Sequence, residues 1–132
     1  RGVTFSTTGT RMFIIGLQNN SVFQYDLTTP FNLSSGVTFS GNSFNVSSEE
    51  GGPRDVEFNS TGTRMFVTGT GSNSVHQYNL GTGFDITTAS FSGNSFDVSL
   101  QESSPQSVTF NNSGSRMFIV GDDTNRVYQY DL

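Results

Sequence analysis

The chain has 132 residues, of which 32% are hydrophobic and 13% aromatic, and its net charge is −5. An acidic chain without a basic stripe is not expected to bind nucleic acid or an anionic membrane surface. The absence of cysteine excludes disulfides, a thiol nucleophile and thiolate metal ligands, and no apolar run is long enough to span a bilayer. Abundant Phe, Ser, Thr, Asn and Gly favour short strands joined by polar turns, so we expect an all-β fold.

One segment occurs three times without gaps, at residues 3–27, 56–80 and 108–132. Two related spacers join the three copies, and they differ by one residue before Phe39 and Phe91. Self-similarity at a period of about 52 residues is typical of repeat architectures. We therefore divide a single array, residues 1–132, into repeat 1 (1–53), repeat 2 (54–105) and a partial repeat 3 (106–132).

Each repeat predicts four strands in chain order. The first is a short Val-Thr-Phe or Val-Glu-Phe segment that leads to a turn with glycine, the residue best suited to a positive φ. The second, Arg-Met-Phe and the residues after it, is apolar on both faces, which indicates a central strand. The third is Val-x-Gln-Tyr. The fourth, present twice, contains Ser-Gly-Asn-Ser, which could form a bulge or divide the strand into a hairpin.

A repeated unit of four antiparallel strands is typical of a β-propeller blade. A β-solenoid is the alternative, but its rungs are usually shorter and lack four distinct strand types. In a propeller, apolar side chains of the second and third strands pack between neighbouring blades. We expect this of Met12, Phe13, Ile14, Val22, Tyr25 and their equivalents, including Val75, Tyr78, Val127 and Tyr130.

The motif Gly-Thr-Arg-Met-Phe-Val-x-Gly, followed by Ser-Val-x-Gln-Tyr-x-Leu, resembles the propeller repeats of the YVTN or lactonase-like type. The repeats are most similar to those in surface proteins of marine bacteria and their phages, and the resemblance covers the whole chain. It implies an extracellular or virion-associated location. Lactonase-like propellers hold a metal at the axis with acidic, Asn and His residues. That set has no counterpart here that we can assign, so the resemblance implies the fold more than an activity.

Both ends of the chain fall in register with the repeat, and a propeller needs four to eight blades. An isolated arc of blades would expose two apolar faces. We therefore expect a ring closed by homo-oligomerisation, with a dimer favoured narrowly over other ring sizes, or closed by repeats outside this sequence.

Candidate catalytic and metal-binding residues are few. His76 is the only histidine, and it stands where the other repeats have Phe23 and Tyr128. We expect it to pack, or to face solvent, as one aromatic side chain among others. Glu49, Glu50 and Glu102 precede first strands, and Asp122 and Asp123 follow a second strand. We interpret these acids as solvated loop charges. Asp122 and Asp123 are at most a weak Ca²⁺ candidate, and we predict no other metal and no cofactor.

Three polar positions are identical in every repeat. The favoured explanation is structural, with Arg pairing to a carboxylate or carbonyl, Asn forming a turn and Gln satisfying backbone groups. The functional explanation is one polar pocket per blade. The candidate binding residues are Arg11, Asn20, Gln24, Arg64, Asn73, Gln77, Arg116, Asn125 and Gln129.

We therefore predict a non-catalytic, multivalent binding module for carbohydrate (lectin-like) or for a cell surface, because a ring multiplies a weak site through effective concentration. A structural or protein-interaction propeller is the first alternative. A lactonase-like hydrolase is the second.

Overall fold

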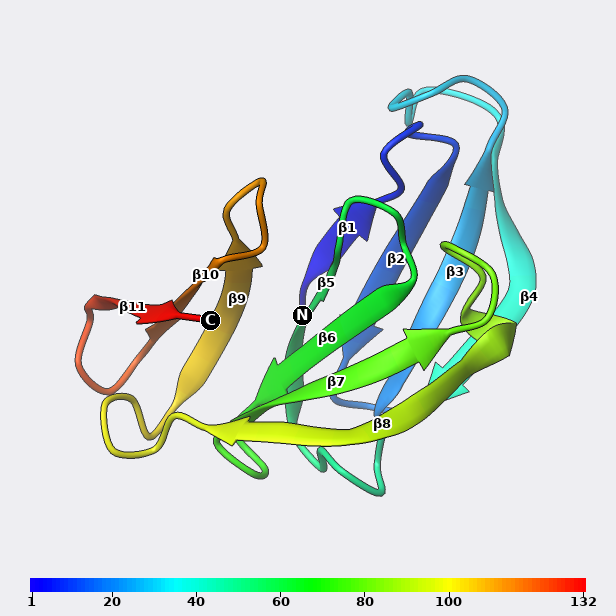
Figure 1. The fold of residues 1–132 in the computed structure, drawn as a ribbon. Coiled ribbons are helices and arrows are strands. Elements are labelled where there is room, and N and C mark those ends of the chain that lie inside the picture. Colours follow the sequence, from blue (N-terminus) through cyan, green and yellow to red (C-terminus); the bar gives the residue numbers. More distant parts are fainter.

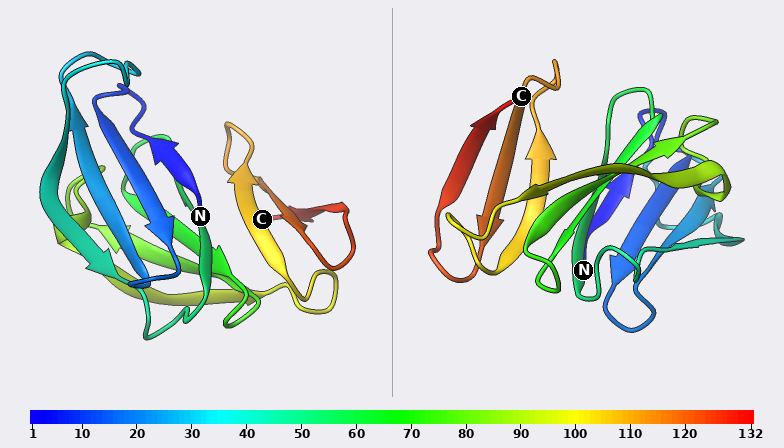
Figure 2. Two further views of the ribbon diagram at one scale, coloured as in Figure 1. Left: turned by 180° about the vertical axis from the view of Figure 1, so that it is seen from behind. Right: turned by 60° about the horizontal axis from the view of Figure 1, so that its bottom comes forward.

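The computed structural model describes all 132 residues. The chain folds into three antiparallel sheets arranged as a fan (Figure 1, Figure 2). The first two sheets have four strands each and the third has three. Sheet 1 contains β1 (Val3–Phe5), β2 (Arg11–Gly16), β3 (Ser21–Leu27) and β4 (Val37–Asn45). Sheet 2 contains β5 (Pro53–Phe58), β6 (Arg64–Gly69), β7 (Ser74–Leu80) and β8 (Ala89–Asp97), with a short 3₁₀ turn, η1 (Ile86–Thr88), before β8. Sheet 3 contains β9 (Pro105–Phe110), β10 (Arg116–Gly121) and β11 (Val127–Asp131).

Each sheet follows chain order, so every strand pairs with its sequence neighbour. The inner strands β1, β5 and β9 contact one another in succession, and β4 and β8 form the outer edges (Figure 2). This up-and-down arrangement of twisted sheets around a common centre is that of β-propeller blades. The predicted all-β propeller fold with four-stranded blades is therefore confirmed. No helix of the structure is long and apolar enough to cross a membrane.

Apolar side chains pack between successive blades, as the repeat predicted. The interface between blades 1 and 2 is the larger one, and Phe13 and Val22 meet Val56, Met65 and Tyr78 there, all of them fully buried. Between blades 2 and 3, Val75 and Val98 pack on Val108, Met117 and Ile119. Full burial of such a side chain contributes roughly 1.5–3 kcal/mol, so these interfaces hold the fan together.

The structure corrects two details of the sequence-based prediction and decides between two alternatives for a third. The first strands of blades 2 and 3 begin earlier than expected, at Pro53 and Pro105. Ile14 and Val127 are exposed rather than packed between blades, because each lies on an end face without a neighbouring blade. The fourth strand is continuous, with a bulge where Gly41 and Gly93 adopt φ of 86° and 84°; the bulge is thus the correct one of the two predicted alternatives.

Candidate functional site

Two glutamates that we interpreted as solvated loop charges are fully buried. Glu50 and Glu102 each end a tight turn, in which their N–H groups donate to the carbonyls of Val46 and Val98 at 2.8 Å. The turn directs each carboxylate inward, under the loop between the second and third strands of the next blade. The interpretation is therefore wrong for these two residues, because the loop supplies enough hydrogen-bond donors to replace water.

The carboxylate of Glu50 accepts four hydrogen bonds. The backbone N–H groups of Gly52 and Gly71 donate at 2.7 Å, and that of Ser72 donates at 3.2 Å. The Ser72 hydroxyl donates at 2.6 Å. In blade 3, Glu102 accepts in the same way from the N–H groups of Ser104, Asp123 and Thr124 and from Thr124 Oγ1. These hydrogen bonds attach blades 2 and 3 to the connections that precede them.

Burial alone would raise the pKa of Glu102. The hydrogen bonds from the Thr124 hydroxyl and from the backbone N–H groups of Ser104, Thr124 and Asp123 outweigh burial and hold the pKa below its ordinary value. Glu102 is therefore an ionised acceptor at neutral pH.

A chain of hydrogen bonds extends from Glu50 to the surface only in blade 2. His76 Nε2 lies 2.8 Å from Ser72 Oγ, and His76 Nδ1 lies 2.7 Å from Ser95 Oγ. His76 is 6% exposed, whereas Ser95 is exposed on the outer strand β8. The groups thus run in the order Glu50, Ser72, His76, Ser95 from the interior outward.

The direction of this chain follows from counting protons. The Ser72 hydroxyl donates its proton to the Glu50 carboxylate, so it can only accept from His76 Nε2. His76 then carries its proton on Nε2, and its Nδ1 has a free lone pair. Ser95 Oγ must donate to that lone pair. The arrangement therefore sets a neutral imidazole to accept the proton of an exposed serine.

Burial keeps the imidazole neutral at pH 7. Burial lowers the pKa of His76 below its ordinary value, and it outweighs the carboxylates of Glu50 and Glu49, which act in the opposite direction. Glu50 Oε2 lies 4.0 Å from Nε2, beyond direct hydrogen-bond distance. A neutral histidine is the form that can act as a general base.

The other blades lack this arrangement. In the strand register, His76 lies opposite Ser95, and Phe23 lies opposite Ser43 in the same positions of blade 1. Tyr128 takes the position in blade 3. His76 is buried, as expected of an aromatic side chain that packs. Its hydrogen bonds to Ser72 and Ser95 were not predicted. The available signals were a single histidine in a third strand and the repeated Ser-Gly-Asn-Ser of the following strand. The sequence alone did not show that Ser72, in the loop before the histidine, would connect His76 to Glu50.

The identical Asn of each repeat occupies a tight turn. Asn20, Asn73 and Asn125 adopt φ of 46°, 54° and 54°, a conformation that Asn tolerates better than most residues. Asn20 can donate to the carbonyls of Leu17 and Gly51. The positive φ of all three residues agrees with the turn role that we favoured, and a binding role at these positions stays a prediction.

The identical Arg and Gln residues have different surroundings in each blade. Arg11 Nη1 donates to the Phe84 carbonyl of the next blade at 2.7 Å, whereas Arg116 pairs at 3.6 Å with an exposed Asp131. Gln24 is buried, and Gln129 is 3.5 Å from Asp131. Arg64 and Gln77 line a groove between blades 2 and 3. Carbohydrate binding at these positions stays a prediction.

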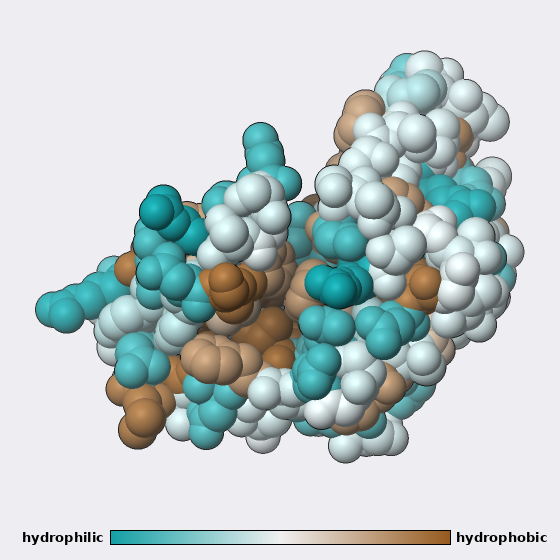
Figure 3. Space-filling view, viewed as in Figure 1, coloured by the Kyte–Doolittle hydropathy of each residue, from teal (hydrophilic) through white to brown (hydrophobic).

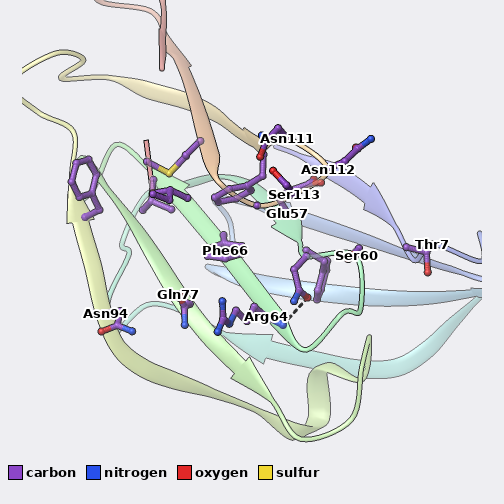
Figure 4. A pocket seen from close by; sticks show the side chains of 18 of the residues that line it. Thr7, Glu57, Ser60, Arg64, Phe66, Gln77, Asn94, Asn111, Asn112 and Ser113 are labelled. Carbon is purple, nitrogen blue, oxygen red and sulfur yellow. Dashed lines mark hydrogen bonds between the residues drawn. The ribbon is translucent and has the colours of Figure 1, made fainter. Parts of the chain in front are cut away.

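This groove has a volume of about 780 Å³ and opens between the third sheet and the rest of the molecule. Figure 3 shows hydrophobic side chains in the hollow between the two parts, and Figure 4 shows Phe66 facing it together with Arg64 and Gln77. Its lining is mixed, since Asn94, Asn111 and other polar residues form the rim.

No group of three or more His, Asp or Glu side chains is arranged to hold a metal ion. Asp123 accepts a hydrogen bond from Ser103 Oγ at 2.6 Å, and Asp122 is exposed beside it. The weak Ca²⁺ candidate at this pair stays a prediction.

Comparison with solved structures supports the fold. The chain is similar to a candidate 6-phosphogluconolactonase from Bacteroides uniformis, with a TM-score of 0.70, 10% identity, and coverage of 100% of this chain and 36% of that one. It is also similar to the periplasmic gluconolactonase of Pseudomonas aeruginosa, with a TM-score of 0.67, 17% identity, and coverage of 98% and 36%. The β-propeller domain of Myceliophteria thermophila Cps50 (Swd1) matches with a TM-score of 0.67, 9% identity, and coverage of 98% and 39%.

The sequence matches no protein-family model and, at a significant level, no curated protein. The chain spans about a third of the length of these solved structures. At such identities the likeness shows the fold, and the chain is a set of β-propeller blades. The expectation that it is not an enzyme is nevertheless contradicted, because lactonase propellers are prominent among the similar structures.

Proposed function

We propose that this propeller is a hydrolase of the lactonase type that cleaves esters or lactones with Ser95 as the nucleophile. The observation that carries the proposal is the directed hydrogen-bond chain from Glu50 through Ser72 and His76 to Ser95. A serine whose proton is accepted by a neutral, oriented imidazole is an activated nucleophile. The likeness to lactonase propellers is consistent with the same class of substrate.

The proposed reaction has two halves. Ser95 Oγ attacks the carbonyl carbon of the lactone while its proton moves to His76 Nδ1. The ring C–O bond then breaks, and His76 returns the proton to the leaving oxygen. This leaves the substrate as an acyl ester on Ser95.

In the second half, water attacks the acyl carbon and gives its proton to His76 Nδ1. The bond between the acyl carbon and Ser95 Oγ breaks as His76 returns that proton to Oγ. The product is a hydroxy acid, and the serine and histidine regain their starting states. Ser72 and Glu50 touch no reacting atom; they are positioning residues that hold the proton on Nε2.

Substitution of the serine and the histidine tests this function with p-nitrophenyl acetate and a sugar lactone as substrates. We expect Ser95→Ala and His76→Phe each to lower kcat/KM by about 100-fold or more, the scale of a lost nucleophile or general base. His76→Phe should fold, since Phe23 takes this position in blade 1.

Ser43→Ala is the matched control, because Ser43 occupies the position of Ser95 in a blade without histidine. It should retain wild-type activity. Unchanged activity of Ser95→Ala would exclude Ser95 as the nucleophile, and loss of activity in His76→Phe alone would then assign the attack to water.

A further inference from the structure

Phe91 lies beside the proposed nucleophile on one face of sheet 2. In the register of β7 and β8, Ser95 opposes His76 and Phe91 opposes Tyr78. Opposed residues, and residues two apart on one strand, point to the same side of a sheet, so these four side chains share a face. Tyr78 packs against Phe44 with ring centroids 5.4 Å apart, which directs this face toward blade 1. Ser95 also borders the groove between blades 2 and 3, but its Oγ bonds His76 on the face toward blade 1.

The bulge in β8 brings Phe91 and Ser95 close together. Four positions along a regular strand span about 13 Å. Here residues 92–94 lie opposite the single residue Gln77, so Phe91 and Ser95 oppose residues that are only two positions apart. Ser92 Oγ donates to the Gln77 carbonyl at 2.8 Å and holds the bulge in place. The separation along the strand shrinks to about 7 Å, which a single small substrate can span.

The ring of Phe91 offers an apolar surface next to the catalytic pair. It is 40% exposed, although Tyr78 opposite it is fully buried between blades 1 and 2. The exposure therefore arises at the outer rim of the blade, where β8 is the edge strand, and not at an end of the fan. The centroid of the ring lies 6.2 Å from that of the His76 imidazole. A substrate chain packed on the ring would remove apolar surface from water, which is favourable.

The charges that act on His76 are negative. Glu50 Oε2 lies 4.0 Å from Nε2, and Glu49 Oε2 accepts a hydrogen bond from the Tyr78 hydroxyl at 3.1 Å. Both carboxylates act electrostatically on the imidazole. A phosphate or carboxylate carried by a substrate would be repelled at this place.

We propose that Phe91 determines the specificity of the site, because its ring binds the apolar part of an uncharged ester or lactone whose carbonyl carbon lies at Ser95 Oγ. This inference rests on the proposed hydrolase function and names the substrate class of the same site. An alkyl or aryl substituent next to the carbonyl packs on the ring. A phosphorylated sugar lactone lacks such a substituent and meets the two carboxylates. Phe91 thus favours substrates by the apolar area that they bury.

Hydrolysis of p-nitrophenyl acetate and p-nitrophenyl hexanoate by the full chain measures this preference. We expect Phe91→Ala to lower the ratio of kcat/KM for the hexanoate to kcat/KM for the acetate by about tenfold, mainly through a higher KM for the hexanoate. Phe91→Leu keeps an apolar side chain and should retain most of the ratio. The wild type should also show a kcat/KM for glucono-δ-lactone about tenfold or more above that for its 6-phosphate.

Phe39→Ala is the matched control. Phe39 opposes Tyr25 in blade 1 as Phe91 opposes Tyr78 in blade 2, but blade 1 has no histidine beside it. This substitution should leave the ratio unchanged. If thermal unfolding shows that Phe91→Ala is unfolded at the assay temperature, Phe91→Gln, which is closer in size but polar, takes its place under the same criterion.

The outcomes separate this inference from the hydrolase function. An unchanged ratio in the Phe91 variant, with hydrolysis retained, would overturn the inference and leave the function standing. A higher kcat/KM for the 6-phosphate than for the unsubstituted lactone would also overturn the inference alone. A folded wild type that hydrolyses none of the four substrates would overturn the proposed function and the inference with it.

Discussion

The chemistry available at His76 depends on the position of one proton. Glu50 takes the hydroxyl proton of Ser72, which obliges His76 to carry its proton on Nε2 and leaves Nδ1 for Ser95. The buried Glu50 carboxylate thus orients the surface serine through Ser72 and His76, although it makes no hydrogen bond to the imidazole. This is a relation between single residues, and it leads to a prediction at this scale.

The prediction concerns the pH dependence of stability. Burial lowers the pKa of His76 in the folded state, so the unfolded chain binds a proton more readily between the folded pKa and the ordinary value near 6.5. The stability of the fold therefore decreases as the pH falls from about 6.5 towards the folded pKa, and this contribution is fully lost below it.

His76→Phe should show a smaller decrease over this window than the wild type, in urea unfolding at a series of pH values. Equal decreases in the two proteins would contradict the stated environment of His76. Protonation of carboxylates with a lowered pKa, such as Glu102, destabilises both proteins equally at acidic pH. The difference between the two proteins therefore reports on the histidine.

Part of the site was visible in the sequence. The lone histidine and the repeated Ser-Gly-Asn-Ser could be read directly, and the polar role of Asn20 and its equivalents in turns was predicted. The burial of Glu50 could not be foreseen, because an acidic pair followed by glycines has the composition of a solvated loop. Only the tertiary position of the loop at Gly71 and Ser72 supplies the donors that make burial possible.

At the scale of the elements, the buried carboxylates of Glu50 and Glu102 attach blades 2 and 3 to the connections that precede them. Glu50→Gln and Glu102→Gln should each destabilise the protein, because an amide in place of the carboxylate leaves buried N–H groups without an acceptor, at roughly 1–3 kcal/mol. Thermal unfolding measures both. Only Glu50→Gln should also lower hydrolysis, since Glu102 has no histidine in its network; equal effects on activity would contradict the role of Glu50 as a positioning residue.

The loop that carries Phe84 gives a second prediction for the elements. Gly62→Ala should destabilise the protein by roughly 1–3 kcal/mol more than Gly41→Ala. Both substitutions place an alanine at a positive φ, but only the first displaces a packed ring, that of Phe84. Chemical denaturation compares the two. Equal losses of stability would mean that packing of the Phe84 ring does not require glycine at position 62.

Elements were the scale at which the sequence was most informative. Three gapless copies of one segment predicted the second and third strands, and apolar positions such as Phe13 and Val22 identified the interface between blades 1 and 2. Ile14 and Val127 were assigned wrongly, because their repeat equivalents are buried and only the position at the end of the fan leaves them uncovered.

At the scale of the whole molecule, the two ends of the fan present complementary faces. Val127 is 68% exposed where its equivalent Val22 is fully buried, and Val3 is 57% exposed where Val56 is fully buried. We propose that these faces cover each other in a closed ring of copies, through a heterologous contact that repeats the interface between blades 1 and 2.

Native mass spectrometry tests this assembly. Val127→Asp should shift the wild-type oligomer to monomer, whereas Leu100→Asp, in an exposed loop away from the end faces, should leave it intact. A wild-type protein with only a 14.3 kDa species would contradict ring closure by identical copies.

An activated serine reacts with electrophilic phosphorus reagents, so covalent labelling distinguishes Ser95 as a nucleophile from an ordinary surface serine. The protein would be treated with a fluorophosphonate and the modified peptide identified by mass spectrometry. We predict an adduct on Ser95, absent from His76→Phe and unaffected by Ser43→Ala. An unlabelled Ser95, or equal labelling of Ser95 with and without His76, would contradict activation of Ser95 by His76.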